Sequence, residues 1–228
     1  MKFYEQDKDT AVLKMYTDIG WWDTNARNMS ETIEQLSAKY KNIIIRAHCY
    51  GGNVFDGNVI YNSLKASKAF ITIRIEGVAA SMMTIVMCGA DKIEICENGL
   101  VMIHCPTSYG GGNAKELQAQ AKLLQMMEKN FIKKYTDKTG KTESEIKALF
   151  DGADNWFDAD EAKAWGLIDE IVPAYVADLG TLAKPEPGTD PALVYNRYTA
   201  LLSNNDFLNK QTTTEASMKK LLITMLAL

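Results

Sequence analysis

The segment Ala69-Phe-Ile-Thr-Ile-Arg-Ile-Glu-Gly-Val-Ala-Ala-Ser-Met82 decides the fold of this 228-residue chain. Its first part, residues 69–76, is a short run rich in isoleucine and predicts a buried strand. Gly77 is expected to end this strand, and the apolar residues that follow Ser81 predict a helix that begins there. A strand that passes through a short turn into a helix is the unit from which parallel α/β sheets are built.

Strand and helix patterns alternate in the same way on both sides of this segment. Ser30 can cap a helix, and the sequences Thr142-Glu-Ser-Glu145 and Asp158-Ala-Asp-Glu161 have the form of capping boxes. We therefore expect an α/β fold with a largely parallel sheet and helices on its faces. The expected strands are 42–47, 69–76, 92–96, 100–104 and 167–172, and the expected helices are about 30–40, 56–67, 81–87, 113–138, 142–150 and 158–166.

The prolines divide the chain into a domain and a tail. Pro106 is the first of five prolines, and the other four fall between residues 173 and 191. Each proline removes a backbone donor and restricts the residue before it, so the segment 183–191 is typical of a linker. The helical spacing of 193–202 and the apolar run 218–228 leave two alternatives for the tail, a disordered segment or the start of a scaffold-like extension. We expect a compact domain at 1–176, a proline-rich linker at 177–192 and a tail at 193–228.

The composition argues against several classes of function. The formal net charge is −4 and no lysine or arginine run exceeds two residues, which argues against a nucleic-acid-binding face. Residues 1–10 lack the apolar core of a secretory signal, and no apolar run approaches the roughly 18 residues that a membrane span needs. The four cysteines are therefore expected to be reduced thiols in a cytoplasmic protein.

Two residue types narrow the search for catalytic groups. A serine at a helix start, such as Ser81, lies beside unpaired backbone N–H groups that favour negative charge, although ordinary helix caps are common at such positions. A general base near neutral pH is usually histidine, and the chain has two, His48 and His104. His104 ends an expected strand and precedes Cys105-Pro106, which suits a catalytic histidine and a structural one alike.

The pairs His48-Cys49 and His104-Cys105 invite comparison with a zinc site. Neighbouring residues of a strand point to opposite faces, so each pair could supply at most one ligand per face, and no C-x₂-C spacing occurs. We therefore expect no metal and no other cofactor. Gly51-Gly52 follows a strand and could present backbone N–H groups to a reacting carbonyl, or could simply make a tight turn.

Four stretches resemble motifs of the Clp protease proteolytic subunit family. Ile45-Arg-Ala-His-Cys-Tyr-Gly-Gly-Asn-Val54 is similar to the family's Ser-Pro-Gly-Gly-x-Val segment, with Cys49-Tyr50 in place of Ser-Pro. Gly77-Val-Ala-Ala-Ser-Met82 resembles its Gly-x-Ala-Ala-Ser-Met nucleophile motif, and Val101-Met-Ile-His-Cys-Pro106 resembles its Val-Met-Ile-His-x-Pro motif. The stretch 154–169 is similar to the one that carries the family's third catalytic residue.

The resemblance implies a Clp-protease, crotonase-like fold with a protruding handle helix at about 113–138. It implies a triad in which Ser81 is the nucleophile, His104 is the general base and Asp154 orients His104. The backbone N–H groups of Gly52 and Met82 would form the oxyanion hole, and Asp151 is the nearest rival of Asp154. The apolar face of the handle fits contacts between subunits as well as packing within one chain; it comprises Leu117, Leu124, Met127 and Phe131.

Within the family, Asp18-Ile-Gly-Trp-Trp22 and the stretch 54–62 most resemble the Clp-related head-maturation, or prohead, proteases of tailed bacteriophages. This likeness implies a serine endopeptidase that cleaves scaffold or capsid precursors in an immature phage head, within the cytoplasm of the bacterial host. It also implies a homo-oligomeric ring. The N-terminal residues do not resemble the loops that meet a ring ATPase, so an ATPase partner stays open.

Three alternatives to this reading stay open. The first is a housekeeping Clp subunit that works with a ring ATPase, and the second is an inactive assembly protein that has kept the fold. The third is an acyl-CoA hydratase or isomerase of the wider crotonase fold. The Gly-x-Ala-Ala-Ser-Met pattern of residues 77–82 argues against this third alternative, because those enzymes do not use a serine nucleophile with a downstream histidine.

Overall fold

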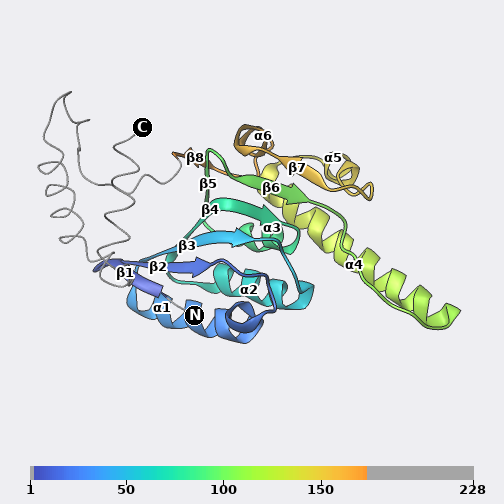
Figure 1. Cartoon of the computed structure of the whole chain (residues 1–228), viewed down its shortest axis with the longest axis horizontal. Coiled ribbons are helices and arrows are strands. Elements are labelled where there is room, and N and C mark those ends of the chain that lie inside the picture. Colours follow the sequence, from blue (N-terminus) through green and yellow to red (C-terminus); the bar gives the residue numbers. More distant parts are fainter. Residues whose placement is uncertain (1–2, 174–228) are drawn as a thin grey trace, which may run out of the picture. The chain divides into compact units, whose positions relative to one another are not determined.

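The fold is a twisted, largely parallel β-sheet with helices packed on it, so the predicted α/β class is confirmed (Figure 1). It is seen in a computed structural model that describes residues 3–173. The predicted linker at 177–192 and tail at 193–228 lie outside the described residues.

Eight strands of the described residues form one sheet. They are β1 (Phe3–Asp7), β2 (Thr10–Met15), β3 (Asn42–Cys49), β4 (Phe70–Ala80), β5 (Lys92–Cys96), β6 (Leu100–Ile103), β7 (Asn155–Phe157) and β8 (Glu170–Val172). The order is β1-β2-β3-β4-β5-β8, and β6 pairs with both β4 and β7. The β1–β2 and β6–β7 pairs are antiparallel, and the remaining pairs of this sheet are parallel.

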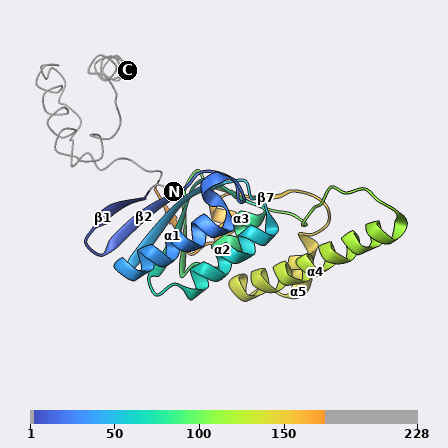
Figure 2. The same ribbon diagram turned by 90° about the horizontal axis from the view of Figure 1, so that it is seen from below.

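The helices connect the strands of the sheet. They are η1 (Trp22–Thr24, a 3₁₀ turn), α1 (Ala26–Lys39), α2 (Val54–Ala66), α3 (Met82–Met87), α4 (Ala114–Thr139), α5 (Glu143–Ala148) and α6 (Ala159–Ala164). Figure 2 shows α1 and α2 lying side by side along the sheet. Both predicted capping boxes are confirmed, because Thr142 and Glu145 cap α5 and Asp158 and Glu161 cap α6.

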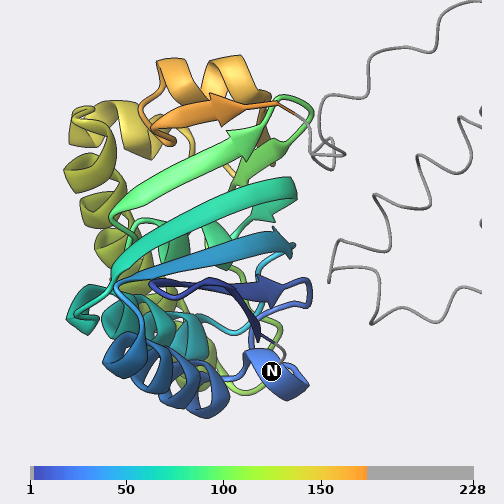
Figure 3. The same cartoon turned by 90° about the vertical axis from the view of Figure 1, so that its left-hand side faces the viewer.

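The core lies between the sheet and the helices on one of its faces. In β3 the side chains of Ile43, Ile45 and Ala47 are buried, whereas Ile44 and Arg46 on the opposite face are half-buried and His48 is exposed. This period of two is what a pleated strand produces when one face is covered more fully than the other. Figure 3 shows the strands fanning across this twisted sheet, with helices gathered on one side.

The prediction that Gly77 ends the central strand is wrong. β4 runs on to Ala80, and it pairs with β5 over Thr72–Ile75 and with β6 over Val78–Ala80. The reason for glycine is a side chain of the neighbouring strand, because a Cβ at position 77 would lie 2.5 Å from Nδ1 of His48. Gly77 therefore leaves room for the His48 ring, at the point where β4 changes its pairing from β5 to β6.

Several predicted boundaries also need correction. α1 begins at Ala26 because Asn25 caps it by accepting from the Asn28 N–H, whereas the predicted cap, Ser30, donates within the helix to the Arg27 carbonyl. The predicted strand 167–172 is shortened to β8. β1, β2 and β7 were not predicted.

Helix α4 has two parts with different surroundings. Phe131, Ile132 and Tyr135 near its C-terminal end are buried, whereas Leu117 is 47% exposed and Met126 is 57% exposed. Figure 1 shows the N-terminal part of α4 running away from the sheet.

No helix within residues 3–173 is long and apolar enough to cross a membrane.

Candidate active site

Ser81 occupies a strained turn between the end of β4 and the start of α3. Its φ of 53° and ψ of −126° lie in a region that residues with a side chain rarely adopt, and such strain is often found at functional sites. The Ser81 N–H donates to the Met102 carbonyl at 2.9 Å, which continues the pairing of β4 with β6. The Ser81 carbonyl accepts from the Thr84 N–H at 2.9 Å. The turn is thus held on both sides of the serine.

A second layer of hydrogen bonds fixes this turn from α4. The Thr84 hydroxyl donates to the Ser81 carbonyl at 2.5 Å and lies 2.6 Å from the Tyr135 hydroxyl. Both side chains are buried, and burial raises the pKa of Tyr135, so its hydroxyl stays protonated. Sequence reasoning missed this pair. The available signal was a lone polar residue inside the apolar run of α3, since buried polar groups are hydrogen-bonded.

His104 lies directly after β6 and contacts both other predicted triad residues. Its Nε2 lies 2.7 Å from the Ser81 Oγ, and its Nδ1 lies 3.1 Å from the Asp154 Oδ1. A carboxylate can only accept, so Nδ1 carries the proton and Nε2 is left to accept from the serine hydroxyl. This tautomer allows the histidine to act as a base toward Ser81.

Strand β6 brings the three side chains together. Ala80, which precedes Ser81, pairs with Met102, and Asn155, which follows Asp154, pairs with Ile103. The strands on the two edges of β6 therefore place Ser81 and Asp154 beside His104, the residue that follows β6. The His104 side chain is 25% exposed and that of Asp154 is 59% exposed, so the pair is reached by water. A solvated pair of this kind adds little stability, and its effect is to orient the imidazole.

Asp151, the rival carboxylate, does not contact His104. Its Oδ1 accepts from the Ala153 N–H at 2.9 Å and shapes the turn before Asp154. The Asn155 amide donates to the carbonyls of Leu149 and Ala153 and ties this turn to the end of α5. The structure thus distinguishes the two aspartates, because Asp154 contacts His104 and Asp151 bonds within the turn.

The Gly51-Gly52 loop lies against Ser81. A Cβ at Gly51 would lie 2.7 Å from the Cβ of Ser81, and both glycines have positive φ values, 106° and 127°. Ile19 forms a parallel bridge with Gly52, in which the Ile19 N–H donates to the Gly51 carbonyl and the Ile19 carbonyl accepts from the Asn53 N–H. In such a bridge the Gly52 N–H points away from Ile19. A Cβ at Gly51 would also lie 3.0 Å from the Met82 nitrogen, so the loop that carries Gly52 lies beside the first residue of α3, and both residues predicted for the oxyanion hole are near Ser81 in the chain's fold.

His48 belongs to a different environment. It packs edge-on against Tyr50 and Tyr16, with ring centroids 5.5 Å and 6.5 Å away. Among residues 3–173 no group of three or more histidine, cysteine or acidic side chains is placed to hold a metal ion. His48 therefore has aromatic neighbours and no metal-ligand set.

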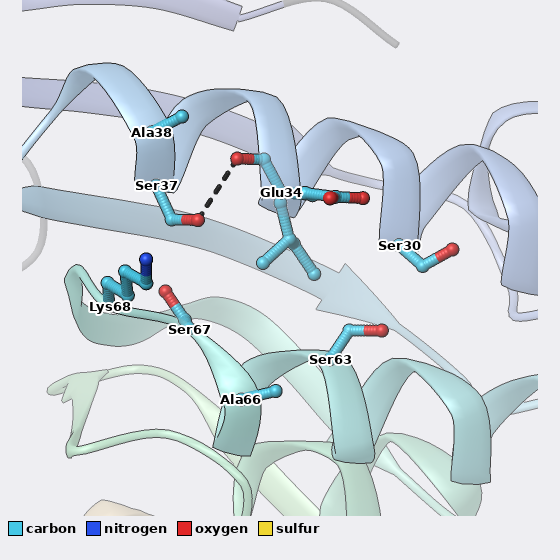
Figure 4. A pocket seen from close by; sticks show the side chains of 9 residues that line it. Ser30, Glu34, Ser37, Ala38, Ser63, Ala66, Ser67 and Lys68 are labelled. Carbon is cyan, nitrogen blue, oxygen red and sulfur yellow. Dashed lines mark hydrogen bonds between the residues drawn. The ribbon is translucent and has the colours of Figure 1, made fainter.

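A groove of about 410 Å³ lies elsewhere, between α1 and α2. Figure 4 shows Ser30, Glu34 and Ser37 on one wall and Ser63, Ser67 and Lys68 on the other. None of these residues belongs to the turn, the strand end or the glycine loop described above. The groove is separate from the Ser81 site.

Fold and site together define an α/β protein in which a serine, a histidine and a carboxylate are hydrogen-bonded in series. A sequence profile of the family described as Clp protease matches residues 9–174. The chain belongs to the Clp protease family, whose members are serine-type peptidases.

Individual relatives agree with this assignment. Proteolytic subunit 1 of the ATP-dependent Clp protease of Leifsonia xyli is 30% identical over 154 residues, which are 65% of this chain and 77% of that subunit. Proteolytic subunit 2 of Tropheryma whipplei is 33% identical over 135 residues, or 58% and 73% of the two chains. A mutant of ClpP1 from Listeria monocytogenes has a similar fold, with a TM-score of 0.63 at 24% identity, covering 71% of this chain and 91% of that one.

We expect the substitution Asp154→Asn to reverse the His104 tautomer. The new amide can donate to Nδ1, so the proton moves to Nε2 and the imidazole can no longer accept from Ser81. The measurement is the ¹⁵N NMR spectrum of the two ring nitrogens at a pH where the imidazole is neutral. Asp151→Asn is the matched control and should leave the spectrum of His104 unchanged. The assignment is contradicted if Asp151→Asn alters the tautomer and Asp154→Asn does not.

Proposed function

We propose that this chain is a serine endopeptidase whose triad is Ser81, His104 and Asp154. The observation that carries the proposal is the 2.7 Å contact from His104 Nε2 to Ser81 Oγ, with Asp154 on the other ring nitrogen. Membership of the Clp protease family supports it, because those proteins are serine-type peptidases.

The chemistry follows from the geometry. The Ser81 Oγ attacks the peptide carbonyl carbon while His104 Nε2 takes the hydroxyl proton. Asp154 keeps the imidazole in the required tautomer and stabilises its charged form. His104 then gives the proton to the leaving amine as the C–N bond breaks, which leaves an ester on Ser81. Water attacks this ester with His104 again acting as base, and the acid product leaves.

The negative oxygen of the intermediate would be held by the N–H groups of Gly52 and Met82. Met82 is the first residue of α3, so its N–H has no partner in the helix. The Gly52 N–H points away from Ile19, and the preceding residue, Gly51, lies against both Ser81 and the Met82 nitrogen. Removing one such donor typically lowers the rate by about 10²–10³-fold.

The finer proposal is that the enzyme processes scaffold or capsid precursors during phage head maturation, as a homo-oligomeric ring in the host cytoplasm. It is supported by the likeness of residues 18–22 and 54–62 to head-maturation proteases. The exposed part of α4, which includes Leu117 and Met126, offers apolar surface for contacts between subunits. The names of the bacterial relatives favour a second candidate, a housekeeping subunit that works with a Clp ATPase.

A fluorophosphonate should label Ser81 in the purified chain. The reagent reacts with serines that a neighbouring base activates, so the adduct should be found by peptide mass spectrometry in the wild type and be lost in His104→Ala.

Ser81→Ala should lower kcat on a peptide substrate by roughly 10⁴-fold or more. Ser63→Ala, in the groove between α1 and α2, is the matched control and should behave as wild type. If hydrolysis survives Ser81→Ala, the triad assignment is contradicted. The activity would then come from a contaminating peptidase, and the chain would be an inactive assembly protein.

The two physiological roles predict different requirements for hydrolysis. A head-maturation enzyme should cleave unfolded casein at a rate that changes less than about twofold when a bacterial Clp ATPase and ATP are added. A housekeeping subunit would need both components, because an ATPase ring delivers its substrate. A rise of tenfold or more with ATPase and ATP, absent in Ser81→Ala, would reject the head-maturation proposal and leave the peptidase assignment intact.

A further inference from the structure

The segment before η1 is hydrogen-bonded along the loop that faces Ser81. The Ile19 N–H donates to the Gly51 carbonyl at 2.6 Å, and the Asn53 N–H donates to the Ile19 carbonyl at 2.9 Å. One residue earlier, the Asp18 Oδ1 accepts from the Tyr50 N–H at 2.9 Å. The loop is thus bound at its start by a side chain and along its length by backbone groups.

This loop needs anchors because its own residues constrain it weakly. Gly51 and Gly52 both have positive φ, and glycine retains more conformational freedom than any other residue. A residue with an N–H group, Tyr50, precedes them, where the similar motif has proline. A proline would fix φ and would offer no donor. Tyr50 leaves φ free but supplies the N–H that Asp18 binds.

Cys49 also contacts the loop, through Gly51, but its contacts are too weak to hold the loop in place of Asp18. Its sulfur accepts from the Gly51 N–H at 3.4 Å and donates to the Gly51 carbonyl at 3.6 Å. Burial raises the pKa of the Cys49 thiol to about 11, so it is neutral at physiological pH. Bonds to a thiol are weak, whereas a bond from an N–H to a carboxylate is charge-assisted and roughly twice as strong as a neutral one.

We propose that Asp18 is a positioning residue for catalysis, whose carboxylate holds the Tyr50 N–H and thereby directs the Gly52 N–H toward the reacting carbonyl. This inference rests on the proposed function, because it assigns the Gly52 N–H to the oxyanion hole. The contribution of Asp18 reaches the reacting atoms through two residues of a loop, and a displacement of about 1 Å at such a donor can lower the rate by about 10²-fold.

The proposal predicts a loss confined to turnover. Asp18→Ala should lower kcat on a peptide substrate by about 10–100-fold and change KM by less than about threefold, because the oxyanion forms after the substrate is bound. Asp18→Asn keeps an oxygen that can accept from the Tyr50 N–H and should recover most of the loss. Asp56→Ala, which removes a carboxylate beside Gly20 without a bond to the loop, is the matched control and should keep the wild-type kcat.

A double-mutant cycle separates this role from a general effect on folding. Tyr50→Pro removes the N–H that Asp18 binds, and Cys49 ends an extended strand, as the residue before a proline requires. In the Tyr50→Pro background, Asp18→Ala should change kcat by less than about twofold. If Asp18→Ala alone does not fold, as judged by circular dichroism, the comparison of Asp18→Asn with and without Tyr50→Pro replaces it.

Three outcomes decide the matter. The inference is supported if kcat falls in Asp18→Ala, recovers in Asp18→Asn and becomes insensitive to residue 18 once Tyr50 is proline. It is overturned if Asp18→Ala keeps the wild-type kcat, or if its loss is the same in both backgrounds. If the wild-type chain shows no hydrolysis, or if its hydrolysis does not depend on Ser81, the proposed function itself is overturned. This result is distinct from the other two.

Discussion

A hydrogen bond from the Ser81 N–H to the Met102 carbonyl decides where the other parts of the site lie. It extends the pairing of β4 with β6 by one residue past the end of the strand and holds a serine at positive φ. His104 follows two residues after Met102, so the same bond sets the distance between imidazole and hydroxyl. On its other edge β6 pairs with β7, and that register brings Asp154 to the second ring nitrogen. One four-residue strand thus fixes three side chains.

The rest of the molecule supports this strand from several directions. From α4, Tyr135 reaches the Ser81 carbonyl through Thr84. From the N-terminal region, the segment around Ile19 binds the glycine loop that lies against the serine. The contact of Tyr135 with Thr84 and that of Ile19 with Gly51 join residues far apart in sequence, and the residues that they join are buried. The geometry of the turn therefore depends on tertiary packing and not on the local preferences of its residues, which disfavour it.

Local patterns were enough to predict the fold class and to make Ser81 and His104 candidates, whereas the resemblance to a family was needed to favour a catalytic role for either. The strand and helix periods are local, and a chain with two histidines leaves few candidates for a base. The third triad position was different, because a solvated aspartate in a turn looks like any other, and only the resemblance to a family distinguished Asp154. The strand after it, β7, has three residues and no pattern long enough to detect.

Other features depended on contacts that a sequence does not display. β1 is mostly exposed and β2 is mostly buried, so neither shows the alternation of buried and exposed residues that reveals a strand in a sequence. Gly77 was taken as the end of a strand because glycine usually interrupts one. Its actual neighbour is the ring of His48 on β3. The bond from Tyr50 to Asp18 likewise joins two loops and has no local signature.

The central claim is that Ser81, His104 and the two amides act on one carbonyl. A crystal structure of the chain inactivated with a peptide boronic acid, which mimics the tetrahedral intermediate, tests it most directly. The account predicts a covalent bond from Ser81 Oγ to boron, with one boronate oxygen about 2.7–3.1 Å from the N–H groups of Gly52 and Met82. A boronate bound elsewhere, or one whose oxygen faces away from both amides, would contradict it.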